Sequence, residues 1–337
     1  MKKIVLAIIA ACSLSSAQAQ ESKNLGTWMK DNKIFQNLDL SVTAGTTGIG
    51  IDLASKIGDN VQLRAGYEFM PRFNMSIYFP VEVGGKPAKQ YDANGNRIES
   101  TFDRLSNMLT DLTGFTVADE VEMIGKPTVN NFKFLVDVFP FRNKHWHFTA
   151  GFYWGPSQFA YAENSTSAMT SLLAVSMYNQ IYDKCVNDEP IIEIDGDGTD
   201  KNPGMSIFLT EAYRQKIVNY GRMGFHVGDN KATGDSYIME AGEDGMVKVR
   251  AKSNPFKPYL GFGYGGRLIK NRDDWKVSFD AGAMFWGGTP DLYTHDGTNL
   301  TNDVENISGK VGDWVDFIGG IKVYPVLSVR FTKSLFK

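Results

Sequence analysis

Apolar and polar residues alternate almost without interruption in three stretches of this chain, residues 61–69, 145–152 and 275–285. Successive side chains of a β-strand point to opposite faces, so each stretch has one continuous apolar face and one polar face. In a membrane barrel the apolar face meets lipid and the polar face lines the interior. The pattern therefore predicts an all-β fold, an antiparallel transmembrane β-barrel. A secreted soluble β-barrel that binds a small apolar ligand is a distant alternative.

The first 19 residues contain the three successive regions of a secretory signal peptide. A cationic start, Met1-Lys2-Lys3, precedes an apolar run over 4–11 and the small residues Ala17-Gln18-Ala19. This run is too short to span a bilayer and predicts cleavage after Ala19 and export to the cell outer membrane. The alternative is a lipoprotein cleavage box over 9–12, which would leave Cys12 lipidated.

The chain divides by pattern into a leader and one interrupted barrel. Residues 20–36 are a polar leader, and 37–337 read as a single β-barrel domain with insertions at 71–127, 157–244 and 287–321. Eight to ten strands are expected, at 38–44, 49–57, 61–69, 132–139, 145–155, 246–252, 258–266, 275–285 and 323–335. Helices are expected at 100–112, 166–184 and 208–222. Long connections are generally extracellular and short ones periplasmic, but nine strands would put the third insertion on the periplasmic side, a conflict that the sequence leaves open.

Several segments resemble a family of small bacterial outer-membrane β-barrel proteins. The resemblance lies in residues 45–53, 60–67, 135–141, 258–265, 279–285 and 324–329. It covers about a third of the chain and none of the insertions. What it implies is an outer-membrane barrel without catalytic residues. The chain departs from the family at its end, Leu335-Phe336-Lys337, because such barrels usually end on the aromatic residue itself.

Charged residues of both signs fall on the polar faces of the expected strands. Charges in a narrow lumen are tolerated when they pair, so this set predicts an interlocked plug. A solute path lined by the same side chains is the alternative. Glycines on the same faces leave room for long side chains. The predicted lumen charges are Asp52, Arg64, Glu68, Asp137, Lys248, Arg250, Asp280 and Arg330.

Aromatic residues gather near the expected strand ends. Trp and Tyr favour the headgroup level of a membrane, which predicts two girdles, with carbohydrate stacking as the alternative. The set is Tyr67, Phe69, Trp146, Trp154, Tyr264, Trp275, Phe285 and Trp286.

An acidic loop in the second insertion resembles part of a Ca²⁺ loop. Asp195, Asp197 and Asp200 alternate with glycines, but Ser206 stands where such a loop carries its last Glu. Weak Ca²⁺ binding is one interpretation, and a solvated turn is the other. No other cofactor is expected.

The expected function is a structural or surface-interaction role, with a charge-plugged lumen and the insertions at 71–127 and 157–244 presented outside. A small-solute channel is the alternative, and no spacing of Ser and His singles out an enzyme. The implied partners are outer-membrane lipid, the barrel assembly machinery and an extracellular partner that the sequence does not identify. A net charge of -3 argues against nucleic acid.

Overall fold

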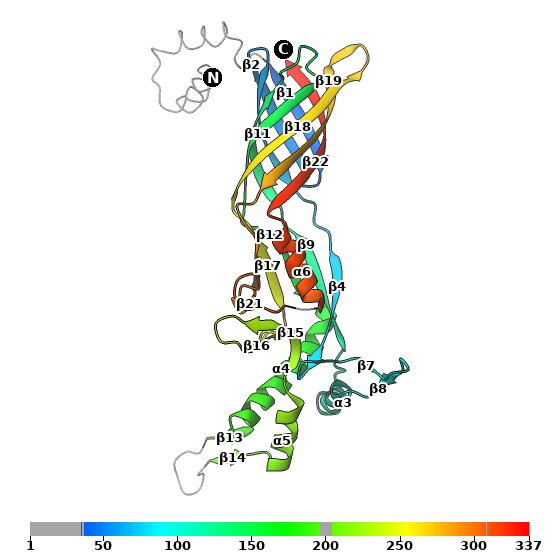
Figure 1. The fold of residues 1–337 in the computed structure, drawn as a ribbon, viewed down its shortest axis with the longest axis vertical. Helices are drawn as coiled ribbons and strands as arrows, with labels where there is room; N and C mark the ends of the chain where they lie inside the picture. The colour runs from blue at the N-terminus through cyan, green and yellow to red at the C-terminus, as the bar shows by residue number, and fades with distance from the viewer. Residues whose placement is uncertain (1–34, 36, 196–203, 308, 337) are drawn as a thin grey trace.

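The computed structural model describes residues 35, 37–195, 204–307 and 309–336. The expected signal peptide at 1–19, Cys12 and nearly all of the leader lie outside these residues. Two parts follow one another along the long axis, a β-barrel that holds the C-terminus and a module built from the insertions (Figure 1).

Eight antiparallel strands close into a barrel, in the order β1-β2-β3-β10-β11-β18-β19-β22, with β22 pairing back to β1. The prediction of an antiparallel barrel with helix-containing long loops is confirmed, at the lower end of the expected strand count. The strands are β1 (Leu38–Gly45), β2 (Gly48–Ile57), β3 (Val61–Phe69), β10 (Asn130–Val138), β11 (Trp146–Trp154), β18 (Phe256–Ile269), β19 (Arg272–Phe285) and β22 (Val323–Phe336).

All three insertions leave the barrel at one end. Strands β2 and β3, β10 and β11, and β18 and β19 are joined by short turns at the other end, where the chain also leaves β22 (Figure 1). In the first of these turns Gly58 has a φ of 68°, a backbone conformation that residues with a side chain rarely adopt. The long connections therefore all lie at one end, which they share with the two-residue turn between β1 and β2, and the other end has short turns alone, as in outer-membrane barrels.

A five-stranded antiparallel sheet continues the barrel wall beyond this end. Its order, β4-β9-β12-β17-β20, repeats the order of the barrel strands to which each is directly joined, β3-β10-β11-β18-β19. The sheet strands are β4 (Met75–Pro80), β9 (Glu120–Pro127), β12 (Gln158–Asn164), β17 (Lys248–Lys252) and β20 (Asp291–Thr294).

One of the nine expected barrel strands, 246–252, is not part of the barrel, so its assignment was wrong. Its residues form β17, which pairs with β12 and β20 in the external sheet. Without it the strand count is even, and the third insertion joins the first two at the same end. The conflict over its side therefore disappears.

Helices and short strands complete this part, here called the insertion module. The three expected helices are present within a few residues of their predicted bounds, and a fourth, α6, lies in the third insertion. The helices are α3 (Thr101–Thr113), α4 (Thr166–Val186), α5 (Glu211–Tyr220) and α6 (Gly309–Gly320). The remaining strands are β5 (Glu82–Val83), β6 (Lys86–Pro87), β7 (Gln90–Tyr91), β8 (Arg97–Ile98), β13 (Ile192–Ile194), β14 (Met205–Ile207), β15 (Met223–Asn230), β16 (Ser236–Met239) and β21 (Val304–Glu305).

The insertion module has an apolar core of its own. Side chains of α3 and α4 pack there against the sheets, and none of this core lies in the barrel. Its most buried members are Val81, Val83, Ala88, Leu105, Leu109, Val121, Leu172, Tyr178, Met223, Val227 and Val247. The two parts are thus stabilised by different interiors.

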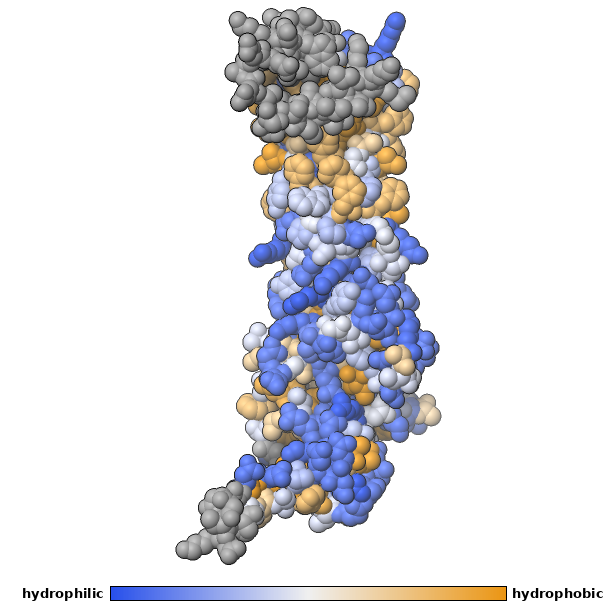
Figure 2. All heavy atoms as spheres, turned by 90° about the vertical axis from the view of Figure 1, so that its left-hand side faces the viewer, coloured by the Kyte–Doolittle hydropathy of each residue, from blue (hydrophilic) through white to orange (hydrophobic). Residues whose placement is uncertain are grey.

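The outer wall of the barrel is apolar, and hydrophilic residues dominate below it (Figure 2). Among its exposed side chains are Val42, Ile51, Leu53, Phe148, Leu260, Phe262, Phe279, Leu327 and Phe331. Trp146 and Trp154, both exposed, are the two ends of the nine-residue strand β11. At about 3.3 Å per residue and a tilt of about 40°, they lie about 20 Å apart along the barrel axis, close to the height of a lipid-facing band. Of the helices in the described ranges, none is long and apolar enough to cross a membrane.

Candidate functional site

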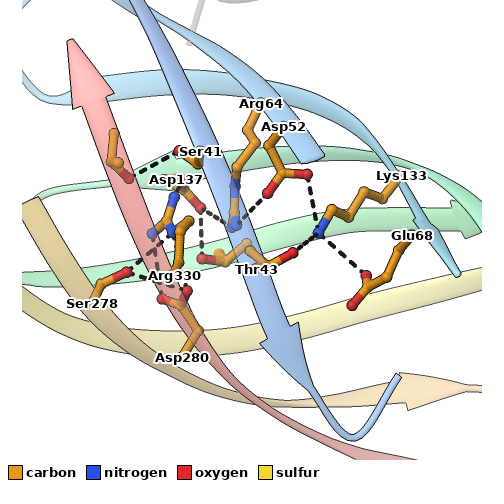
Figure 3. A network of polar contacts seen from close by, with 12 residues as sticks. Ser41, Thr43, Asp52, Arg64, Glu68, Lys133, Asp137, Ser278, Asp280 and Arg330 are labelled. Atoms are coloured by element: carbon orange, nitrogen blue, oxygen red, sulfur yellow. Dashed lines mark hydrogen bonds and ion pairs between the residues drawn. The ribbon is translucent and has the colours of Figure 1, made fainter. Parts of the chain in front are cut away.

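The barrel lumen holds a chain of charged side chains that alternate in sign. Strand pairing brings polar residues of several strands to similar depths, and their side chains meet inside the closed wall (Figure 3). The ion pairs run from Glu68 through Lys133, Asp52, Arg64, Asp137 and Arg330 to Asp280, and His147 lies next to Asp280 at the end of the chain. Every member is at most 7% exposed. Buried charges of this kind stay in a protein when each meets an opposite charge.

Two arginines hold Asp137 at the centre of this chain. Arg64 Nη2 lies 3.0 Å from Asp137 Oδ1, and Arg330 Nη1 lies 3.3 Å from Asp137 Oδ2. The Thr149 hydroxyl also donates to Asp137 Oδ1, at 2.7 Å. Asp137 thus accepts three hydrogen bonds with no water needed to satisfy it.

Arg330 continues the chain to Asp280 and His147. Its Nε lies 3.1 Å from Asp280 Oδ2, and Ser278 Oγ accepts from the same nitrogen at 3.0 Å. His147 Nε2 lies 2.7 Å from Asp280 Oδ1. Strands β11, β19 and β22 are tied together at this depth.

Lys133 forms the other end. Its Nζ lies 3.0 Å from Asp52 Oδ1 and 3.2 Å from Glu68 Oε2, and it donates to Thr43 Oγ1 at 3.3 Å. Arg64 Nη1 lies 3.7 Å from Asp52 Oδ2, which links this end to the centre. The contacts of Asp52 have ion-pair distances without hydrogen-bond geometry.

Glycines make room for these groups, as the sequence pattern predicts. A Cβ on Gly66 would lie 2.0 Å from Asp52 Oδ1. A Cβ on Gly263 would lie 2.2 Å from Asp280 Oδ1 and 2.4 Å from the His147 ring. Neither contact is sterically allowed, so the carboxylates occupy space that only glycine leaves open.

An apolar cluster lies where the barrel strands approach the insertion module. It consists of Leu135, Tyr153, Tyr259, Met284, Trp286 and Val326, with Phe159, Ile321 and Tyr324 packed against it. The rings of Trp286 and Tyr324 stack with their centroids 5.3 Å apart. Trp286 was expected in the outer girdle, but it lies inside, only 4% exposed. The other seven members of that set carry exposed or half-exposed side chains on the barrel.

Six of the eight predicted lumen charges lie in the ion chain, namely Asp52, Arg64, Glu68, Asp137, Asp280 and Arg330. Lys248 and Arg250 do not, and their assignment to the lumen was wrong because they lie on β17 of the external sheet. Side chains alternate between the two faces of β17 with the same period of two as in a barrel strand, so the sequence pattern does not distinguish the two cases.

Sequence reasoning missed Lys133, and it did not single out His147 as a lumen partner. Lys133 stands two residues before Leu135 and four before Asp137 on the inward face of β10, so the alternation itself was sufficient to find it. The apolar Leu135 on that face hid the pattern. His145, two residues before His147, is half-exposed, and its Nδ1 lies 2.8 Å from the Gly265 carbonyl oxygen.

The Ca²⁺ interpretation stays a prediction, because only one of its three carboxylates is among the described residues. Asp195 is an exposed residue following β13, while Asp197 and Asp200 lie outside the described residues. Within the described ranges no three His, Cys, Asp or Glu side chains are placed to hold a metal ion.

No protein-family model and no curated protein matches this chain. Among solved structures it is similar to CarO2 of Acinetobacter baumannii, with TM-score 0.37, 14% identity and coverage of 88% of this chain and 98% of that one. It is similar to CarO of Acinetobacter baumannii, with TM-score 0.36, 18% identity and coverage of 91% and 99%. A major outer membrane protein from Thermus thermophilus gives TM-score 0.31, 8% identity and coverage of 89% and 98%. Likeness at this level assigns neither a family nor a function to this chain.

Proposed function

We propose that this chain is an integral outer-membrane protein whose barrel is a closed anchor, and that the anchor presents the insertion module at the cell surface for interaction with a partner. The observation that carries the proposal is the ion chain, which crosses the lumen of a barrel whose outer wall is apolar. Eight strands leave an interior just wide enough for side chains. Such a barrel anchors the insertion module in the membrane and does not conduct solutes.

The placement of the long connections supports the proposed orientation. Three short turns and the C-terminal end of β22 lie at one end of the barrel, and all three insertions lie at the other, together with the two-residue turn between β1 and β2. In outer-membrane barrels the short turns are periplasmic. The insertion module, with its own core, then stands outside the cell. Outer-membrane lipid and the barrel assembly machinery are the partners that this placement requires.

The interior also argues against the secreted barrel with an apolar ligand. Such a barrel needs an apolar cavity at its centre, and here the centre holds the buried carboxylates of Asp52, Asp137 and Asp280. The apolar surface lies on the outside instead. Recovery of the protein from a cell lysate in the soluble fraction, without detergent, would overturn the membrane anchor.

Conductance in planar bilayers tests the closed lumen. We expect no large, steady open current from the purified protein, because the ion chain crosses the lumen. Replacing both arginines of the chain, in an Arg64→Ser, Arg330→Ser variant, is expected to produce current if the barrel still folds. Large steady currents from the unmodified protein would overturn the closed anchor and establish the channel.

One observation favours the channel alternative. Lys257 is 3% exposed, and its Nζ reaches only Asn131 Oδ1 at 3.4 Å and the Pro255 carbonyl at 3.5 Å. None of the described carboxylates lies within ion-pair distance. A buried amine without a counter-charge is costly and is typical of a site that receives an anion. A Lys257→Met variant therefore belongs in the conductance experiment, where a change in anion selectivity would support the channel.

Protease treatment of intact cells tests the orientation. Cleavage within the insertion module, with the barrel left in the membrane, is the expected result. Complete protection in intact cells, together with cleavage after the outer membrane is opened, would place the module in the periplasm.

A further inference from the structure

The far end of the insertion module carries a small sheet with an uncovered apolar face. The sheet consists of β13 and β14 and is here called the tip ribbon (Figure 1). Ile192 lies opposite Ile207 in its register, and Ile194 lies opposite Met205. Side chains two residues apart on a strand point to the same face, so these four share one face. Each of them is between 41% and 53% exposed. The tip ribbon thus presents an apolar face to solvent.

The tip ribbon has neither a third strand nor a cover among the described residues. No other described strand pairs with it. The helix that follows, α5, buries none of its residues, and Phe208 and Tyr213 are 55% and 62% exposed. A two-stranded sheet is marginally stable in water until a further strand or a packed face is added. Neighbouring exposed apolar side chains of this kind mark a surface that binds another molecule.

Carboxylates accompany the apolar face. Glu193 points to the opposite face of β13, and Glu189 and Asp195 stand before and after that strand, all three exposed. In the described part of the chain none of the three has a cation within ion-pair distance. By sequence, residues 186–210 hold six carboxylates and one lysine, in a chain whose net charge is only -3. The tip is therefore the acidic end of the molecule.

This charge distinguishes the occupants that the apolar face could have. A second copy of the chain would bring the same carboxylates together, and like charges across an interface oppose association. The membrane around the barrel lies at the other end of the molecule (Figure 1). A partner with cationic side chains is attracted by the carboxylates and gains from covering the apolar face.

The ribbon also specifies the shape of this partner. An extended segment that pairs with a free strand edge satisfies main-chain groups there and makes a three-stranded sheet. Side chains of such a segment alternate between the two faces. Every second one would continue the apolar face of Ile192 and Ile194, and the others would lie on the face of Glu193. Apolar and basic residues in alternation match both faces at once.

We infer that the tip ribbon binds an extended segment of a partner protein in which apolar and basic residues alternate, and that this segment adds as a third strand at the edge of β13. The inference rests on the proposed function and deepens it, because it gives the chemistry of the partner that the insertion module meets at the cell surface. Pairing along β13 places a basic side chain of the segment directly beside Glu193.

Fluorescence anisotropy of a short labelled peptide in which Val and Lys alternate tests this inference. The peptide is titrated with the full-length protein in neutral detergent micelles that contain EDTA, and empty micelles provide the blank. Three further peptides are compared: one with the same residues in separate blocks, one that alternates Val and Glu, and one that alternates Ser and Lys. The alternating Val and Lys peptide is expected to bind most tightly, and more weakly as salt is added.

Each comparison peptide has an outcome that would overturn part of the inference. Equal binding of the block peptide would exclude pairing as a strand. Equal binding of the Val and Glu peptide would exclude recognition of positive charge, and equal binding of the Ser and Lys peptide would exclude a role for the apolar face.

Two variants locate the binding. Ile192→Ser is expected to weaken it about tenfold, because it removes apolar contact area. Ile98→Ser is the matched control, since Ile98 is 43% exposed on β8 in another two-stranded sheet of the module. Glu193→Gln is expected to weaken binding about threefold and to reduce its salt dependence. Glu305→Gln, at an exposed position on β21, is the control for charge.

Equal weakening in either control and its partner variant would remove the site from the tip ribbon. Heat-dependent migration on electrophoresis reports whether each variant's barrel is folded. Self-association of the purified protein that Ile192→Ser abolishes would assign the apolar face to a second copy and overturn the partner strand. A membrane-integrated protein that binds no alternating peptide would overturn this inference alone. Protection of the module from protease in intact cells would overturn the surface placement, whatever the peptide does.

Discussion

Arg330 Nη1 lies 3.3 Å from Asp137 Oδ2, although 193 positions separate the two residues in the chain. They stand on β22 and β10, which are four strands apart in the eight-stranded barrel and therefore face each other across the lumen. The contact joins opposite walls that no main-chain hydrogen bond can join. Removing charges from the ion chain should accordingly affect the whole barrel.

Arg64→Ala is expected to lower the free energy of unfolding by about 3 kcal/mol, near the low end for a broken buried pair, because Asp52 and Asp137 each keep a second cation. In the Arg64→Ala, Asp137→Ala double variant the loss should fall short of the sum of the single losses by more than about 0.5 kcal/mol. Urea unfolding in lipid vesicles, followed by tryptophan fluorescence, measures both. Lys126→Ala, which breaks a half-buried pair with Glu163, is the control and should cost at most about 1 kcal/mol. Additive losses would contradict the network.

Gly66→Ala is expected to destabilise the barrel by about 1–3 kcal/mol, because the new methyl group would lie 2.0 Å from Asp52 Oδ1 and 2.4 Å from the Ile51 carbonyl oxygen. Gly125→Ala on β9 is the matched control, since its Cβ would meet its nearest neighbour at an ordinary 3.6 Å. The same unfolding experiment distinguishes them. Equal stability of the two variants would mean that the lumen has room that the structure does not show.

Leu105→Ala is expected to weaken the insertion module and leave the barrel intact. Leu105 is 1% exposed in the module core, where such a truncation costs about 2–5 kcal/mol. Limited proteolysis should show faster cleavage of the module while the barrel keeps its heat-dependent migration. Met108→Ala on the same helix removes a 40% exposed side chain and should leave the cleavage rate nearly unchanged. Loss of barrel migration in Leu105→Ala would show that the two interiors are coupled.

Acid is expected to destabilise the insertion module through Asp296. Burial raises the pKa of this carboxyl, but hydrogen bonds from Thr294 and from the Thr298 amide outweigh burial and lower the pKa below its usual value. A carboxyl with a lowered folded-state pKa contributes stability above its unfolded pKa of about 3.9 and loses that contribution as the pH falls through the folded value.

Near-ultraviolet circular dichroism of the module during urea unfolding, repeated at decreasing pH, measures this effect. Asp296→Asn should show a smaller loss of stability below about pH 4 than the unmodified protein, because its side chain does not titrate. Asp235→Asn, at an exposed position, is the control and should keep the full loss. If stability falls with pH in the same way for all three proteins, Asp296 does not contribute to the acid sensitivity.

Many features of the fold follow from residues that are close together in the sequence. The alternation at 61–69 and 275–285 assigns each side chain to a wall or to the interior, and the structure places Arg64, Glu68 and Asp280 inside accordingly. Helix α3 is equally local. Its capping box at Ser100 and Asp103 and its apolar positions mark both its start and its buried side.

The sequence by itself determined the strands, their two faces and the need to pair the inward charges, because the pleat has a period of two wherever a strand lies. Only the tertiary structure decided which strands close the barrel, since β17 alternates as regularly in the external sheet as it would in the wall. It also decided that Trp286 turns inward, and that Lys133, Arg64 and Arg330 divide four carboxylates among them. These outcomes depend on strand order and register, which bring side chains from distant parts of the chain to one depth, and neighbouring residues along the sequence carry no record of that depth.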